Sequence, residues 1–71
     1  MAFGRLFERY FRMVHGVLLA RVDKRDADDL VQDVFMIALG KLHQLEEPDA
    51  FGAWLAQITR NRATDHLRAG R

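Results

Sequence analysis

The stretch Asp26–Leu45, DADDLVQDVFMIALGKLHQL, decides the fold that this sequence predicts. Asp26 can cap the first free backbone N–H groups of a helix, and Asp29 follows three residues later, where a capping-box carboxylate lies. Apolar residues then recur at helical spacing along two neighbouring lines. The first line is Leu30, Val34 and Ile37, and the second is Val31, Phe35, Ala38, Leu42 and Leu45. This double stripe predicts the central helix of a small bundle.

The outer side of the same helix carries an acidic and amphipathic strip. We call the acidic strip the set Asp29, Gln32, Asp33 and Met36, which recurs at i, i+3, i+4 and i+7. A solvated helix face is the plain interpretation of such a set. A partner protein is the alternative, because a flexible thioether adapts to another surface and carboxylates accept paired hydrogen bonds from Arg.

The charges of this 71-residue chain are segregated, although its net charge is only +1. Residues 1–22 hold four Arg and one Glu, residues 23–49 hold eight acids and three bases, and residues 50–71 hold four Arg and one Asp. The three segments therefore carry about +3, −5 and +3. A chain with this pattern can hold a basic partner and a polyanion at the same time.

The composition argues against an enzyme, a metal protein and a membrane protein. The chain has no Cys, which excludes disulfides and thiolate metal sites and suits a reducing compartment. No Ser or Cys nucleophile and no Gly-rich phosphate loop occurs, and the three His residues are widely spaced. No apolar run approaches the roughly 20 residues that span a bilayer. We expect a cytoplasmic protein that needs no cofactor or metal.

Two further helices flank the central one, which makes the predicted fold class all-α, a compact three-helix bundle. The first is expected from about Phe3 to Ala20 or Val22, with an inward stripe of Phe3, Leu6, Phe7, Tyr10, Met13, Val14, Val17 and Leu18. A polar turn, Asp23-Lys24-Arg25, follows it. The break at Glu46–Asp49, which contains the only Pro, precedes a third helix from about Ala50 to Ala69.

The third helix combines an apolar side with a basic and amide side. The expected inward residues are Phe51, Trp54, Leu55, Ile58, Ala63 and Leu67, and the outward ones are Gln57, Arg60, Asn61, Thr64, Asp65, Arg68 and Arg71. Basic and amide side chains on one helix face are typical of nucleic-acid binding, although a solvated face gives the same pattern. Phe51 and Trp54 can stack on unpaired bases or can belong to the core.

Two segments, DADDLVQDVFMIAL and FGAWLAQITRNRATDHLR, resemble region 2 of bacterial sigma factors of the extracytoplasmic-function (ECF) group. The resemblance implies that the segment DLVQD, residues 29–33, binds the clamp helices of the largest subunit of core RNA polymerase. This role falls on Asp29, Gln32 and Asp33, with Met36 one turn further on. The implied chemistry is Asp or Gln of this chain against Arg of the polymerase.

The same resemblance implies that the loop Glu47–Phe51 captures a base flipped from the non-template strand of the −10 promoter element. Asp49 and Phe51 belong to this loop. The helix after the loop would lie along the neighbouring DNA, with contacts from Arg60, Asn61, Thr64, Arg68 and Arg71. An anti-sigma factor is a further implied partner. We expect no interaction with a membrane.

The sequence also departs from the family pattern. Gly52 stands where the family often has a basic residue, and the segment EEPDA makes the loop acidic. The C-terminal domain that reads the −35 element has no counterpart, so residues 1–71 are interpreted as one region 2 domain, either excised or truncated. A helical protein-interaction module without DNA binding and a duplex-binding domain unrelated to polymerase remain as alternatives.

Overall fold

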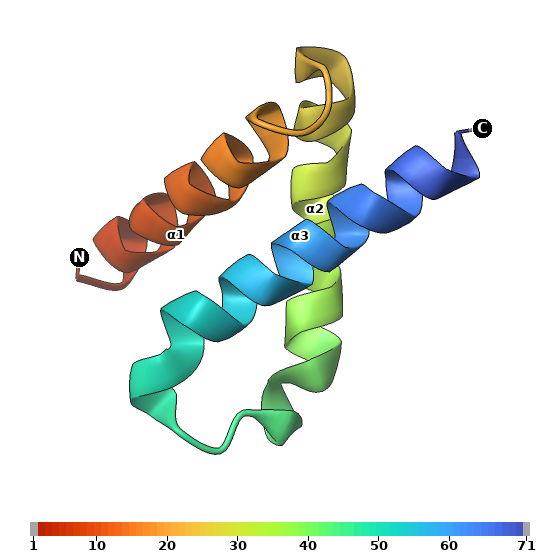
Figure 1. The fold of residues 1–71 in the computed structure, drawn as a ribbon. Helices are drawn as coiled ribbons and strands as arrows, with labels where there is room; N and C mark the ends of the chain where they lie inside the picture. The colour runs from red at the N-terminus through yellow and green to blue at the C-terminus, as the bar shows by residue number, and fades with distance from the viewer. Residues whose placement is uncertain (1, 71) are drawn as a thin grey trace.

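The computed structural model describes the backbone of residues 2–70 and the side chains of residues 8–70. It contains three long helices, α1 (Ala2–Leu19), α2 (Lys24–Lys41) and α3 (Phe51–Ala69), and two short 3-10 helices, η1 (Leu42–Gln44) and η2 (Pro48–Ala50) (Figure 1). The predicted all-α, three-helix fold is therefore confirmed. Among residues 2–70, no helix combines the length and the apolar character that a bilayer crossing requires.

The three long helices form a bundle in which each helix packs against the other two. In Figure 1, α1 and α3 run in the same general direction, and α2 crosses behind α3. The chain therefore reverses direction twice, once in the short turn after α1 and once in the loop that holds η1 and η2. Because α2 contacts both neighbours, its outer side is the part of that helix left for solvent or a partner.

The start of α2 differs from the prediction. Asp23, not Asp26, is the N-cap, and one of its carboxylate oxygens accepts a hydrogen bond of 3.1 Å from the backbone N–H of Asp26. The helix begins three residues earlier than predicted, at Lys24 rather than Ala27, because Asp23 has the capping spacing and Lys24 and Arg25 are good helix formers. The predicted polar turn is consequently the first part of the helix, and the Asp26 carboxylate is free to contact another helix.

The end of α2 also comes earlier than predicted, at Lys41 rather than Leu45. The chain continues as η1, becomes extended at Leu45, and enters η2 with Pro48 in its first turn. This agrees with the rule that Pro suits the start of a helical segment and not its interior. The change of helix type moves Leu42, predicted to point inward, to a position where it is 46% exposed.

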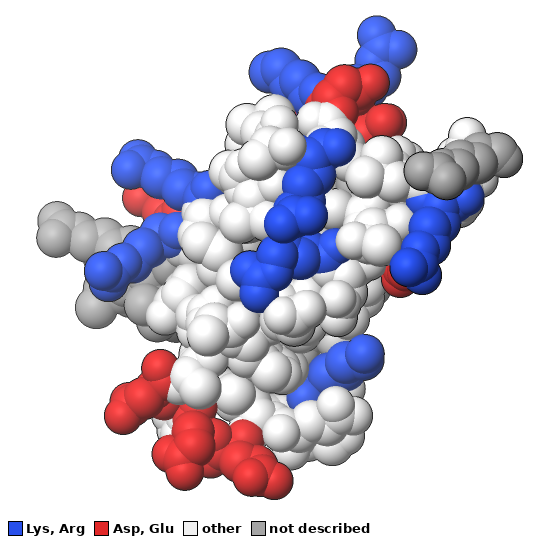
Figure 2. All heavy atoms as spheres, in the orientation of Figure 1, with Lys and Arg blue, Asp and Glu red and all other residues white. Residues whose placement is uncertain are grey.

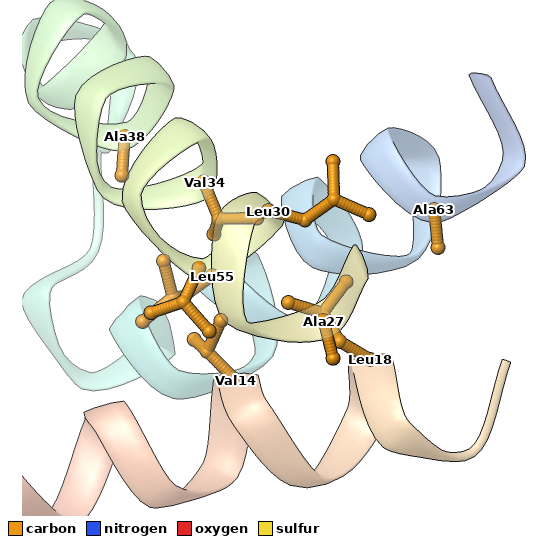
Figure 3. Close-up of a cluster of buried hydrophobic side chains, with 9 residues drawn as sticks. Val14, Leu18, Ala27, Leu30, Val34, Ala38, Leu55 and Ala63 are labelled. Carbon is orange, nitrogen blue, oxygen red and sulfur yellow. The ribbon is translucent and has the colours of Figure 1, made fainter. Parts of the chain in front are cut away.

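The core lies where the three helices meet. Its buried apolar residues are Val14, Leu18, Ala27, Leu30, Val31, Val34, Ala38, Leu55 and Ala63 (Figure 3). Thr59 is buried with them, a position that the sequence pattern did not predict. Its hydroxyl donates a 2.7 Å hydrogen bond to the carbonyl oxygen of Leu55, so the polar group is satisfied within its own helix.

The prediction for Leu67 was wrong, because this side chain is 48% exposed. Leu67 follows the buried Ala63 by four residues, which rotates it by about 40° away from the Ala63 direction. Near the end of α3, which projects past the other helices in Figure 1, that rotation is enough to expose it. The predicted inward side chains Phe3, Leu6 and Phe7 lie outside the described side chains.

Candidate functional site

The acidic strip lies on the exposed side of α2. Asp29, Gln32 and Asp33 are exposed, and Met36 keeps 72% of its surface in contact with solvent. Within the described side chains, Asp29 and Gln32 form no hydrogen bond or ion pair. These polar groups are therefore available to another molecule.

Leu39 extends the acidic strip by one turn and was not among the residues predicted to belong to this surface. It follows Met36 by three residues, and it is 71% exposed. The signal for it was present, because Leu39 belongs to neither of the two apolar lines of the double stripe. Two neighbouring apolar side chains with this much exposure suit contact with a protein better than contact with water.

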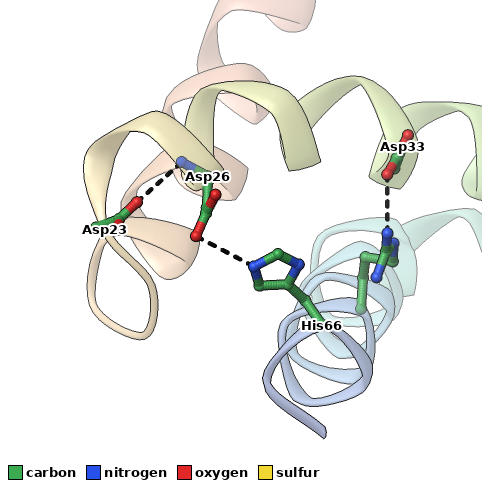
Figure 4. Close-up of polar contacts among 5 residues, drawn as sticks. Asp23, Asp26, Asp33 and His66 are labelled. Carbon is green, nitrogen blue, oxygen red and sulfur yellow. Dashed lines mark hydrogen bonds and ion pairs between the residues drawn. The ribbon is translucent and has the colours of Figure 1, made fainter. Parts of the chain in front are cut away.

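Asp33 is the member of the acidic strip that contacts its own bundle. Its Oδ2 accepts a 3.0 Å hydrogen bond from a guanidinium nitrogen of Arg62 on α3, and the same contact is an ion pair between the two side chains (Figure 4). The side chains of Asp33 and Arg62 are 50% and 28% exposed, so the pair lies at the edge of the helix interface. Nothing in the sequence pattern indicated a role for Arg62.

Two further acids of α2 also contact neighbouring helices through His residues. Asp26 lies 3.2 Å from the His66 ring nitrogen on α3, in the same view (Figure 4), and Asp28 lies 2.8 Å from that of His15 on α1. The contact with His15 is the main reason why the pKa of the Asp28 carboxyl lies below its ordinary value, and Lys24 acts in the same direction. The acids on the sides of α2 thus connect helices, whereas Asp29 and Gln32 on its outer face do not.

The lowered pKa of Asp28 makes the free energy of unfolding of the bundle depend on pH in the acid range. The stabilising contribution is complete above the unfolded value, near 3.8, and is lost as the pH falls through the lower pKa of the folded state. We expect the free energy of unfolding to fall less steeply in this acid range for Asp28→Asn than for the unaltered chain. Urea titrations at a series of pH values, followed by circular dichroism, measure this. Parallel pH profiles for the two proteins would contradict the assignment.

The outer face of α3 carries the predicted DNA-binding residues. Gln57 links two of them, because its Oε1 accepts a 2.9 Å hydrogen bond from Arg60 and its Nε2 donates one of 3.0 Å to Asn61 Oδ1. Arg60 and Thr64 are partly exposed, and Arg68 is exposed. Arg68 follows Arg60 by eight positions, which places the two about 80° apart around the helix, on the same side.

One predicted DNA contact cannot be located. Arg71 lies outside the described residues. Four of the others lie within about 100° of one another around α3, namely Arg60, Asn61, Thr64 and Arg68. Phe51, the first residue of α3, lies on a different side and packs against Tyr10 of α1.

The loop between α2 and α3 is acidic and exposed, and its far end is attached to the bundle by aromatic rings. Asp49 is exposed, whereas Phe51 is partly buried and packs edge-on against Tyr10 of α1, with ring centroids 4.9 Å apart. The rings of Phe51 and Trp54 also contact each other, with their centroids 5.8 Å apart. The role of Phe51 in stacking on a base stays a prediction, and its ring already contributes to packing.

Acidic side chains gather at one end of the molecule, whereas elsewhere in the view of Figure 2 acidic and basic side chains lie beside one another. Figure 2 shows a group of acidic side chains at the end of the molecule where the loop after α2 lies in Figure 1. Basic side chains cross the middle of the same view, where α3 runs. Among the described residues, no group of three or more His, Cys, Asp or Glu side chains is placed to hold a metal ion.

Comparison with known proteins gives a family for this arrangement. Residues 6–71 match the family model described as Sigma-70 region 2. The ECF RNA polymerase sigma factor BldN of Streptomyces coelicolor is 38% identical over 72 residues, which cover 99% of this chain and 27% of that protein. The ECF RNA polymerase sigma-E factor of Haemophilus influenzae is 35% identical over 68 residues, covering 96% of this chain and 36% of that protein.

A third relative extends the comparison to another genus. The RNA polymerase sigma factor CnrH of Cupriavidus metallidurans is 37% identical and covers 94% of this chain and 36% of its own length. The chain thus spans less than half the length of each of these three relatives. No solved structure matches it at a comparable level of significance. The extent of the family match shows that the chain belongs to the Sigma-70 region 2 family of sigma factors.

Proposed function

We propose that this domain acts in transcription initiation by docking on the clamp helices of the largest subunit of core RNA polymerase and presenting α3 to the −10 promoter element. The observation that carries the proposal is the separation of two exposed faces. The acidic strip lies on the outer side of α2, and the basic and amide residues lie on the outer side of α3. A domain built in this way can bind a protein and DNA together without either partner covering the other site.

The docking surface uses both charge and apolar contact. Asp29 and Gln32 accept hydrogen bonds from Arg side chains of the polymerase, and charge-assisted bonds of this kind are shorter and stronger than neutral ones. Met36 and Leu39 then pack against apolar positions of the same partner, which accounts for their exposure. An anti-sigma factor that covers this face would compete directly with polymerase.

In the proposed DNA surface, α3 and the loop make different kinds of contact with DNA. Arg60 and Arg68 neutralise phosphates, whereas Asn61 and Thr64 hydrogen-bond to the backbone or to base edges. The acidic loop repels phosphates, so it contacts DNA only through a base, with Asp49 accepting a hydrogen bond from an exocyclic amino group. Capture of an extruded base offsets the few kcal/mol that unstacking costs. The domain makes and breaks no covalent bond in this process.

The DNA part of the proposal predicts a selective effect of two substitutions. Arg60→Ala and Arg68→Ala should each weaken DNA binding by the complex of this chain with core polymerase, because each removes one phosphate contact. The slope of log K against log salt should become shallower by about 0.7–0.9 per contact. The measurement is fluorescence anisotropy of a fork-junction DNA whose single-stranded non-template overhang carries a randomised −10 segment.

Arg12→Ala is the matched control, because Arg12 is an exposed Arg on α1. All three variants should still bind polymerase with unchanged affinity. If the Arg60 and Arg68 variants bind DNA like the Arg12 variant, α3 is misassigned. If the complex with the unaltered chain binds no DNA, a protein-interaction module without DNA binding becomes the better account. Binding to fully paired DNA with the same affinity would instead favour a duplex-binding domain.

A further inference from the structure

Arg62 is the residue of α3 that touches the acidic strip. It contacts Asp33 at 3.0 Å, across 29 residues of sequence. Helical spacing places Arg62 about 160° around α3 from Arg60, on the side that faces α2. Arg62 is therefore separate from the DNA-binding face, and its structural neighbour is the docking surface.

The geometry of this pair leaves part of the carboxylate open. Arg62 bonds to Oδ2 of Asp33, and no described residue donates a hydrogen bond to Oδ1. A carboxylate offers about four lone-pair positions on its two oxygens, so one internal donor does not saturate it. Since half of the Asp33 side chain is exposed, a guanidinium from a partner can bind the same group from the solvent side.

Arg62 is itself well held. Its side chain is only 28% exposed, and His66, one turn further along α3, contacts Asp26 on the same neighbouring helix. These two contacts fix α3 against α2 at points one turn apart on α3. The packing of the helices thus fixes the backbone position of Arg62. Its guanidinium group can therefore hold the Asp33 side chain in one orientation.

We propose that Arg62 is a positioning residue for polymerase docking, which holds Asp33 so that its Oδ1 is presented to a cationic side chain of the polymerase. This inference rests on the proposed docking function. An exposed Asp on a helix otherwise samples several rotamers, and a partner has to select one of them on binding. A carboxylate that is already held in one orientation loses less side-chain conformational entropy on binding. In the complex, Asp33 lies between two guanidinium groups, one from each protein.

The test is a double-mutant cycle on the affinity for the isolated clamp-helix fragment of the largest polymerase subunit, measured by calorimetry. Arg62→Met keeps the aliphatic stem and removes the donor, and it should weaken binding by roughly two- to tenfold. Arg62→Lys keeps the positive charge but lacks the planar guanidinium group with its paired N–H donors. Its affinity for the fragment should therefore lie between those of Arg62→Met and the unaltered chain. In an Asp33→Asn background, Arg62→Met should have little further effect, because Arg62 acts through the Asp33 carboxylate.

Arg12→Met, on an exposed part of α1, is the matched control and should bind normally. Unfolding curves for every variant establish that the measurements are made on folded protein. Equal or tighter binding by Arg62→Met, or a full loss that persists in the Asp33→Asn background, would overturn the positioning role. Normal binding by Asp33→Asn alone would also overturn the positioning role, because Arg62 is proposed to act through the Asp33 carboxylate. Absence of binding between the unaltered chain and the clamp-helix fragment would overturn the docking function itself, so the two failures are distinguishable.

Discussion

Replacing Gln32 by Ala and Asp33 by Arg in the same chain is expected to abolish capture of core RNA polymerase. The change removes two hydrogen-bonding groups, the Gln32 amide and the Asp33 carboxylate, and sets a positive charge against a surface that we propose to be basic. Like charges placed together at an interface cost several kcal/mol, which corresponds to a loss of about a hundredfold or more in affinity. Co-elution of the chain with core polymerase on size exclusion, at several concentrations, measures the effect.

The fold should survive this double substitution. The lost contact between Asp33 and Arg62 is a partly exposed pair, and such pairs typically contribute about 0.2–1 kcal/mol. Asp65→Arg makes the same change of charge at an exposed position on α3 and serves as the control. Capture that is unchanged in the double variant, or equally reduced in the control, would contradict the assignment of the acidic strip.

The second large effect is on stability. Leu55→Ala should lower the free energy of unfolding by about 2–5 kcal/mol, because the Leu55 side chain is fully buried where the helices meet. A domain of this length is expected to have only roughly 4–11 kcal/mol in total. The variant should therefore be partly unfolded at physiological temperature. Urea denaturation followed by circular dichroism gives the difference directly.

Leu39→Ala is the matched substitution on the outside of the bundle. Leu39 is 71% exposed, so we expect its truncation to change the free energy of unfolding by about 0.5 kcal/mol or less. Similar losses for the two variants would mean that the positions of Leu55 and Leu39 relative to the core are wrong. Because Leu39 also extends the acidic strip, the same variant should bind polymerase more weakly while remaining stable.

Helical periodicity was sufficient to predict the three helices and most of the core. Leu30, Val31, Val34 and Ala38 were all predicted from the double stripe of the central helix, and all are buried. The exposure of the acidic strip followed from the same periodicity. These features depend on which side of one helix a residue occupies, and the sequence spacing determines that side directly.

Features that depend on how two helices cross were harder to predict. The pairing of Asp33 with Arg62 and of Asp26 with His66 requires the relative position of α2 and α3, which spacing within either helix does not contain. The N-cap was misplaced for a local reason, since Asp23 and Asp26 both offer a capping carboxylate. Thr59 was missed because a hydroxyl that bonds to its own helix can be buried like an apolar group.

In the proposed function, the acidic loop limits how this domain can approach DNA. Glu46, Glu47 and Asp49 are exposed, and none of them is paired with a basic side chain among the described residues. Free DNA is therefore repelled at this end of the molecule, and binding of DNA by the isolated domain should be weak. Docking on polymerase first, through a different face, would hold the loop near a strand that it does not attract by itself.

The central claim is that the protein partner binds the outer face of α2 and leaves the outer face of α3 free. Chemical-shift mapping tests this most directly, with the isotope-labelled chain titrated with the clamp-helix fragment of the largest polymerase subunit. We predict that the largest perturbations fall on Asp29, Gln32, Asp33, Met36 and Leu39. The absence of perturbation, or perturbations centred on Arg60, Thr64 and Arg68, would contradict the account.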